Sequence, residues 1–140
     1  MKRTHSILIG IFFIAFVLSI QTARAQEDVG RLLKQLENNS DRFSKTLNQA
    51  LDGSRFNGTS TEDQINGYVK QFEDSTDRLK KNYDKGQNMR VSSTEVIERG
   101  GTINTFLRKN HMGPAVTTDW NTIKSDLNRL ARATKVKKRW

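Results

Sequence analysis

Residues 29–51 carry the pattern that most constrains the fold. Apolar and small residues recur there in steps of four and three, at Val29, Leu33, Leu36, Ser40, Phe43, Leu47 and Ala50. This spacing keeps one stripe of side chains on one side of an α-helix. The pattern predicts an amphipathic helix over about residues 27–52, ended by Gly53. Residues 38–41, Asn-Asn-Ser-Asp, also suit a turn, so a kink there is the alternative.

Three further segments repeat the spacing. Their predicted N-caps are Ser60, Ser92 and Thr117 or Thr118, and their stripes run to about residues 85, 110 and 134. Gly86 is the predicted stop of the second helix, and Met112-Gly113-Pro114 that of the third. Four amphipathic segments joined by short loops, with no convincing strand, predict an all-α, antiparallel four-helix bundle.

A short phrase recurs at the centre of the first two stripes. Ser40-Asp41-Arg42-Phe43 returns as Thr76-Asp77-Arg78-Leu79. We interpret Ser40 and Thr76 as a small buried polar layer that sets helix register. Asp41, Arg42, Asp77 and Arg78 are then a structural polar group, an ion-pair network between the first two helices. A catalytic pair of Asp41 and Asp77 is the weaker alternative.

Two glycines, Gly100 and Gly101, lie inside the third predicted helix, where each costs roughly 1 kcal/mol. Close contact with a neighbouring helix and a local break at Thr102 are the two plain explanations. A ligand that approaches bare backbone is the third.

The beginning of the chain has the layout of a secretory signal peptide. Lys2 and Arg3 give a positive start, residues 7–20 are an apolar run, and Ala23-Arg24-Ala25 suits signal peptidase. The run is shorter than the roughly 20 residues that cross a bilayer, which favours cleavage after Ala25 over an uncleaved anchor. We therefore predict a signal peptide over residues 1–25, a helical domain over 26–134 and a basic tail over 135–140. The expected location is periplasmic or extracellular.

Composition narrows the chemistry. The chain has no cysteine, which excludes thiol chemistry and disulfides. After cleavage His111 is the one histidine left, and the sequence has no Glu-x-x-His motif, glycine-rich phosphate loop or nucleophile elbow. We therefore predict a protein that is not an enzyme and that holds no cofactor and no metal.

The end of the chain is basic. The net charge is +9, and it is +6 once the signal peptide takes three basic residues and no acidic one. The candidate anion-binding residues are Lys135, Lys137, Lys138 and Arg139, for lipid headgroups, lipopolysaccharide or another envelope polyanion. A frayed, solubilising tail is the plainer alternative. Export argues against nucleic acid as a partner.

Several phrases together resemble a group of uncharacterised exported bacterial proteins. They are Ser-Asp-Arg-Phe followed by Leu-x-x-Ala-Leu-Asp (residues 40–43 and 47–52), Glu62-Asp63-Gln64-Ile65-Asn66, Phe72-Glu73-x-x-Thr76-Asp77-x-Leu79 and Trp120-x-x-Ile123-x-x-Asp126-Leu127-x-x-Leu130-Ala131. The resemblance covers nearly all of the predicted mature chain, and it implies export and a single domain but no activity or ligand. Members of the group end in alternating aromatics, whereas this chain has Lys138 before Trp140.

The leading hypothesis is a non-enzymatic exported helical bundle that acts through contacts with a protein or an envelope component. The alternative is a binder of anionic membrane surfaces that uses the basic C-terminus.

Overall fold

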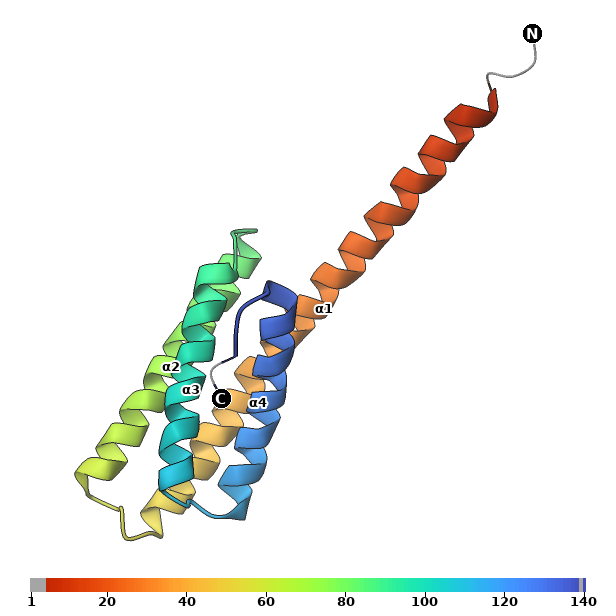
Figure 1. Cartoon of the computed structure of the whole chain (residues 1–140). Coiled ribbons are helices and arrows are strands. Elements are labelled where there is room, and N and C mark those ends of the chain that lie inside the picture. Colours follow the sequence, from red (N-terminus) through yellow and green to blue (C-terminus); the bar gives the residue numbers. More distant parts are fainter. Residues whose placement is uncertain (1–4, 139) are drawn as a thin grey trace. The chain divides into compact units, whose positions relative to one another are not determined.

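The computed structural model describes the backbone of residues 5–138 and 140 and the side chains of residues 28–138 and 140. The described residues form four helices, α1 (His5–Asp52), α2 (Ser60–Asp84), α3 (Arg90–Lys109) and α4 (Pro114–Thr134) (Figure 1). The chain divides into two units, Met1–Arg31 and Leu32–Trp140. The second unit joins the later part of α1 to α2, α3 and α4, and it confirms the predicted all-α four-helix bundle.

The predicted signal peptide, residues 1–25, lies outside the residues whose side chains the structure describes. Where backbone is described in the first unit, it is helical and belongs to α1. Within the described part of the chain, no helix combines the length and the apolar character that a membrane crossing requires.

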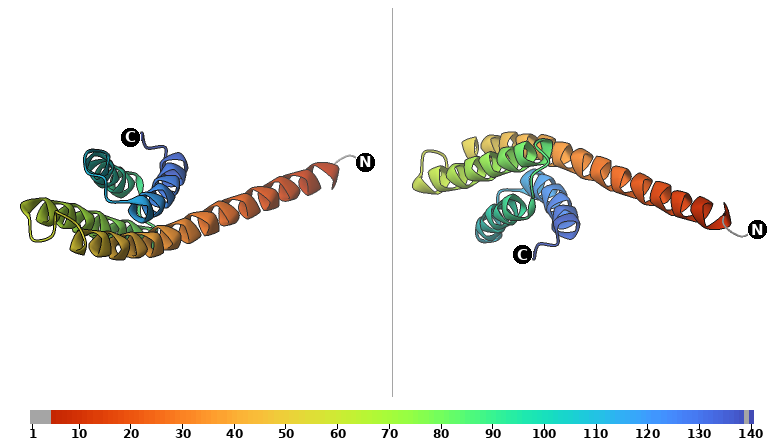
Figure 2. Two further views of the ribbon diagram at one scale, coloured as in Figure 1. Left: turned by 90° about the horizontal axis from the view of Figure 1, so that it is seen from below. Right: turned by 90° about the horizontal axis from the view of Figure 1, so that it is seen from above.

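The bundle has two layers of antiparallel helices. Figure 2 shows α1 beside α2 in one layer and α3 beside α4 in the other. The connections, residues 53–59, 85–89 and 110–113, are short, so helices that follow one another along the chain pack as antiparallel neighbours.

The core lies between the two layers and is centred on Trp120 of α4. Its ring centroid is 5.2 Å from that of Phe43 in α1 and 6.2 Å from that of Phe72 in α2. Nε1 of Trp120 donates a hydrogen bond to Oδ1 of Asn104 in α3, at 3.1 Å. The indole thus contacts all three other helices, and its one polar group is paired inside the core.

The helical stripes are the buried faces. In α1 the residues Leu33, Leu36, Ser40, Phe43 and Leu47 are buried, as their spacing predicts. The helix is continuous through residues 38–41, so no turn interrupts it there, and it ends at Asp52 as predicted. An unbroken helix across this polar stretch keeps the apolar side chains of the stripe on the core side.

Three predicted N-caps are wrong by one to five residues. Thr59 precedes α2 in place of Ser60, and α3 begins at Arg90, so that Ser92 lies in its first turn. The fourth helix begins at Pro114 in place of Thr117 or Thr118. Proline has the right φ for a first helical position and lacks an N–H that would be unpaired there. The proline expected to end one helix therefore begins the next.

The third helix runs through Gly100 and Gly101 without interruption, so the local break considered at Thr102 does not occur. A Cβ atom on Gly100 would lie 2.6 Å from Cδ1 of Leu127 in α4. Close contact with a neighbouring helix, the first of the three explanations, is therefore confirmed for Gly100. The missing side chain lets α3 and α4 approach each other.

Candidate functional site

The small polar residues of the repeated phrase are buried but do not bond to one another. The hydroxyl of Ser40 donates to the carbonyl oxygen of Leu36 at 2.7 Å, and that of Thr76 donates to the carbonyl oxygen of Phe72 at 3.0 Å. Each hydroxyl is thus satisfied by the carbonyl four residues earlier in its own helix. Ser40 and Thr76 are both buried, as the interpretation of a small polar layer requires. Their hydroxyls add no hydrogen bond between the helices.

The two arginines of the phrase reach the opposite layer. Nε of Arg42 donates to Oδ1 of Asp119 in α4 at 2.9 Å. Nη2 of Arg78 donates to Oε1 of Glu95 in α3 at 2.6 Å. The ion-pair network predicted between α1 and α2 is therefore wrong, because adjacent residues of a helix point in different directions and the arginines face other helices.

The two aspartates of the phrase, Asp41 and Asp77, are both exposed. Burial raises the pKa of Glu73 in α2, a hydrogen bond from Ser44 lowers it, and the charges of Asp41, Asp74 and Asp77 raise it further. The structure thus brings Asp41 and Asp77 to one acidic patch around a half-buried glutamate. Asp77 lines an open hollow of about 540 Å³ beside α2, and Asp41 is not part of its lining. The two carboxylates therefore share no cavity, which gives the catalytic pair no support.

Sequence reasoning missed a polar seam between α1 and α4. Asp126 is only 5% exposed and accepts hydrogen bonds from Nδ2 of Asn39 at 2.6 Å and Nη1 of Arg129 at 3.4 Å. Arg129 also donates to Oε1 of Gln35 at 2.9 Å. The available signal was the place of Asp126 directly before the stripe residue Leu127, at the edge of an apolar face. The polar side chains of this seam hydrogen-bond to one another between α1 and α4. Their role is therefore to join the two helices.

The basic C-terminal segment folds back over α3 and α4. Lys135 takes a left-handed conformation with φ of 55°, and the Val136 N–H donates to the carbonyl oxygen of Ala131 at 3.0 Å. This ends α4 in the way that glycine usually does and reverses the chain. In Figure 1 the segment then runs back between α3 and α4.

Trp140 holds the far end of this segment on the bundle. Its Nε1 donates to Oδ1 of Asn128 in α4 at 3.2 Å. Its Cζ3 atom lies 3.7 Å from the place where a Cβ of Gly100 would stand. A tail frayed away from the domain, the plainer of the two predictions, does not describe these residues.

The fold-back brings basic side chains together at the beginning of α3. Lys135, Val136 and Lys137 line one side of a shallow cavity of about 240 Å³, and Arg90, Thr94 and Glu98 of α3 line the other. Lys138 is exposed, and Arg139 lies outside the described residues. We call the six residues that line this cavity the basic surface. Three of them are basic and one is acidic, so the surface carries a positive charge. The N-terminal end of the α3 dipole adds to it.

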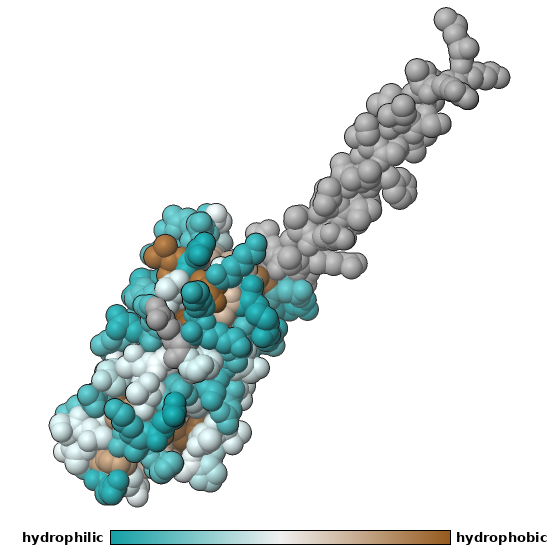
Figure 3. Space-filling model, in the orientation of Figure 1, coloured by the Kyte–Doolittle hydropathy of each residue, from teal (hydrophilic) through white to brown (hydrophobic). Residues whose placement is uncertain are grey.

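The surface around the segment is hydrophilic. Figure 3 shows this face in teal and white, with brown in small separate spots. Val91 is the one large hydrophobic side chain that is exposed among the described residues. Such a face suits ionic contacts more than burial of a large apolar area.

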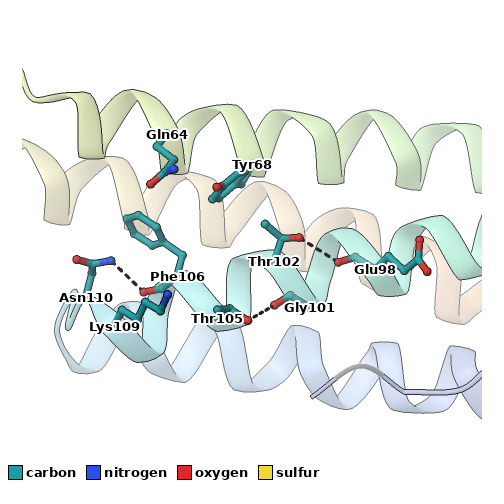
Figure 4. A pocket seen from close by; sticks show the side chains of 9 residues that line it. All are labelled: Gln64, Tyr68, Glu98, Gly101, Thr102, Thr105, Phe106, Lys109 and Asn110. Carbon is teal, nitrogen blue, oxygen red and sulfur yellow. Dashed lines mark hydrogen bonds between the residues drawn. The ribbon is translucent and has the colours of Figure 1, made fainter.

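A larger hollow, of about 600 Å³, lies between α2 and α3 (Figure 4). It is lined by Gln64, Tyr68, Glu98, Gly101, Thr102, Thr105, Phe106, Lys109 and Asn110. Several of its polar groups are used within α3: the hydroxyls of Thr102 and Thr105 and the amide of Asn110 donate to backbone carbonyls. The Tyr68 ring meets Phe106 edge-on, with centroids 6.3 Å apart. The hollow therefore presents a polar wall with an aromatic floor and one lysine.

No group of three or more His, Asp or Glu side chains is placed to hold a metal ion within the described residues. His111 is exposed. Comparison of the chain with protein-family models, curated proteins and solved structures found no match. The function is therefore inferred from the arrangement of the residues in the structure.

Proposed function

We propose that this chain is a non-enzymatic exported helical-bundle protein that binds an anionic lipid surface of the cell envelope through its basic C-terminal segment. The observation that carries the proposal is the fold-back, which holds Lys135 and Lys137 beside Arg90. Basic residues near an anionic bilayer contribute about 1 kcal/mol each to binding. A segment that is already held in place also loses less conformational entropy on binding than a frayed one does.

The form of the basic surface favours a lipid surface over a small anion. Its cavity is shallow, and Lys138 extends the exposed positive charge along the same segment. Basic groups spread over an open face can each meet a different headgroup, whereas a single phosphate is bound best by donors that converge on one point.

The test is binding of the full chain to vesicles of neutral phosphatidylcholine, with and without anionic phosphatidylglycerol, at low and high salt. We expect the apolar run at residues 7–20 to add to binding of both kinds of vesicle. The ratio of anionic to neutral binding is therefore the quantity to compare. We expect a ratio well above one that falls as salt screens the charges.

Charge variants locate the contact. Replacing Lys137→Gln and Lys138→Gln together is expected to lower the ratio about fivefold for each charge removed. Lys109→Gln removes one charge beside the hollow between α2 and α3. It is the control for the expected loss per charge and should change the ratio little. A ratio that is unchanged in the Lys137 and Lys138 variant, or independent of salt, would show the proposal to be wrong.

A further inference from the structure

We infer that Trp140 is the positioning residue of the basic surface. Its indole, seated on Gly100 and bonded to Asn128, holds Lys135 and Lys137 beside Arg90. The inference rests on the proposed function, since it concerns how that anion-binding surface is kept in place.

The indole lies against a glycine of α3, Gly100. A Cβ on Gly100 would lie 2.6 Å from Cδ1 of Leu127 and 3.7 Å from atoms of both Phe72 and Trp140. Leu127 fills the space that a side chain at this position would need, and the indole lies at ordinary van der Waals distance beside it. Gly100 therefore has a core leucine and the C-terminal indole as close neighbours.

The indole N–H needs an acceptor when the ring is partly buried. Oδ1 of Asn128, on α4, supplies it at 3.2 Å. The ring thus contacts α3 while its N–H is bonded to α4, and this fixes its place between the two helices. Neither contact involves a lysine, so the seating of the ring can be changed without changing the charge.

The segment between the two fixed points is short. It is tied to α4 by the bond from Val136 to Ala131 and to the bundle again by Trp140. Because a residue spans at most about 3.6 Å, the backbone of Lys137 and Lys138 stays within a few residue lengths of a fixed point on either side. Without Trp140 the segment is held at one end, and its lysines leave Arg90 for part of the time.

The apparent affinity of a site falls in proportion to the fraction of time that the competent arrangement is populated. Releasing the ring should therefore weaken the ionic part of binding without altering any charge. The coupling is reciprocal, so that binding of anionic lipid should also favour the seated ring.

The experiment compares the full chain with Trp140→Ala, Trp140→Phe and Asn128→Ala in the vesicle assay. We expect Trp140→Ala to lower the ratio of anionic to neutral binding roughly threefold to tenfold, with a smaller loss for Trp140→Phe, which keeps a ring. Asn128→Ala removes only the acceptor and is expected to resemble Trp140→Phe. Thermal unfolding followed by circular dichroism checks that each variant keeps its fold.

A direct insertion of the indole into lipid makes different predictions. It would lower binding of Trp140→Ala to neutral and anionic vesicles alike, and it would leave Asn128→Ala unaffected. That result would overturn the inference. ¹⁹F spectra of the chain labelled with fluorotryptophan give an independent reading, because loss of a signal in Trp140→Phe identifies Trp140. We expect its ring to be less exposed to solvent than free tryptophan is, and more exposed in Asn128→Ala.

The remaining outcomes separate this inference from the proposed function. If Trp140→Ala binds as the wild type does while the Lys137 and Lys138 variant loses binding, the function stands and the positioning role is wrong. If the lysine variant also binds as the wild type does, the proposed function is wrong and the positioning role is wrong with it.

Discussion

Arg42 of α1 donates from Nε to Oδ1 of Asp119 in α4, across 2.9 Å. The repeated phrase makes the equivalent contact in the other half of the bundle, from Arg78 of α2 to Glu95 of α3. Both acids are the sixth residue of their helices. The repeat thus marks two matched antiparallel pairs, α1 with α4 and α2 with α3.

The first prediction concerns the energies of these two pairs. The Asp119 side chain is 14% exposed and also accepts from Thr46, whereas Glu95 is 36% exposed. We expect a coupling of about 1 kcal/mol for Arg42 with Asp119 and about 0.5 kcal/mol or less for Arg78 with Glu95, since solvent screens the second pair more. Double-mutant cycles to alanine, measured by urea unfolding, test this. The reverse order of the two couplings would contradict it.

The second prediction concerns the buried carboxylate of the α1–α4 seam. Asp126→Ala is expected to lower the free energy of unfolding by about 1–2 kcal/mol, because it leaves Nδ2 of half-buried Asn39 without its acceptor. Asp77→Ala, at an exposed position of α2, is the control and is expected to change stability by less than about 0.5 kcal/mol. Equal effects of the two variants would show that the buried hydrogen bonds of Asp126 contribute little to the free energy of unfolding.

The third prediction compares two helical glycines. Gly67 in α2 has nothing within 4 Å of a new Cβ, so Gly67→Ala should stabilise the protein by roughly 0.5–1 kcal/mol. Gly100→Ala should instead destabilise it by about 1–2 kcal/mol, because the overpacking against buried Leu127 outweighs the same gain in helix propensity. Thermal or urea unfolding of both variants measures the difference. Stabilisation by Gly100→Ala would mean that the Leu127 side chain can move aside at little energetic cost.

The fourth prediction is a pH dependence at Glu73. Burial and the charges of Asp41, Asp74 and Asp77 raise its pKa above the ordinary value of 4.5. The folded protein then binds more protons than the unfolded chain does, so this group lowers stability as the pH rises through 4.5 towards the raised pKa. Glu73→Gln should therefore gain stability relative to the wild type as the pH rises from about 4 to about 7. Urea unfolding of both proteins across this range tests the sign. A larger stability advantage of Glu73→Gln at pH 4 than at pH 7 would contradict the prediction.

The fifth prediction concerns a buried hydroxyl in α3. Among the described atoms Oγ of Ser93 has no hydrogen-bond partner, and the residue is fully buried. Ser75 is equally buried, but its hydroxyl donates to the carbonyl oxygen of Phe72 at 2.7 Å. We expect Ser93→Ala to be more stabilising than Ser75→Ala by about 1 kcal/mol, because only the first relieves an unpaired polar group. Equal effects in urea unfolding would contradict this.

The local features of the fold were predictable because they depend on near neighbours in sequence. The four-and-three spacing indicated four helices, and the end of α1 at Asp52 followed from Gly53. Gly86 ends α2 with a φ of +65°, as a glycine stop does. Helix starts were harder to predict, because several residues between 110 and 118 are each able to cap a helix. Pro114 is the residue that begins α4.

The candidate site was predictable only in its composition. The sequence identified Lys135, Lys137, Lys138 and Arg139 as basic groups at one end of the chain, and no local pattern shows where that end lies. Its fold-back places Trp140 against Gly100 and Asn128, which stand 40 and 12 residues earlier in the chain.

The sequence by itself determined the helices and the faces they bury, because a period of 3.6 residues is set by neighbours in the chain. Only the tertiary structure decided which helix each polar side chain meets. Arg42 and Arg78 stand beside aspartates in sequence and bond to acids on α4 and α3, because long side chains reach whatever helix packs alongside. The seat of Trp140 on Gly100 was decided in the same way, by the close approach of α3 and α4.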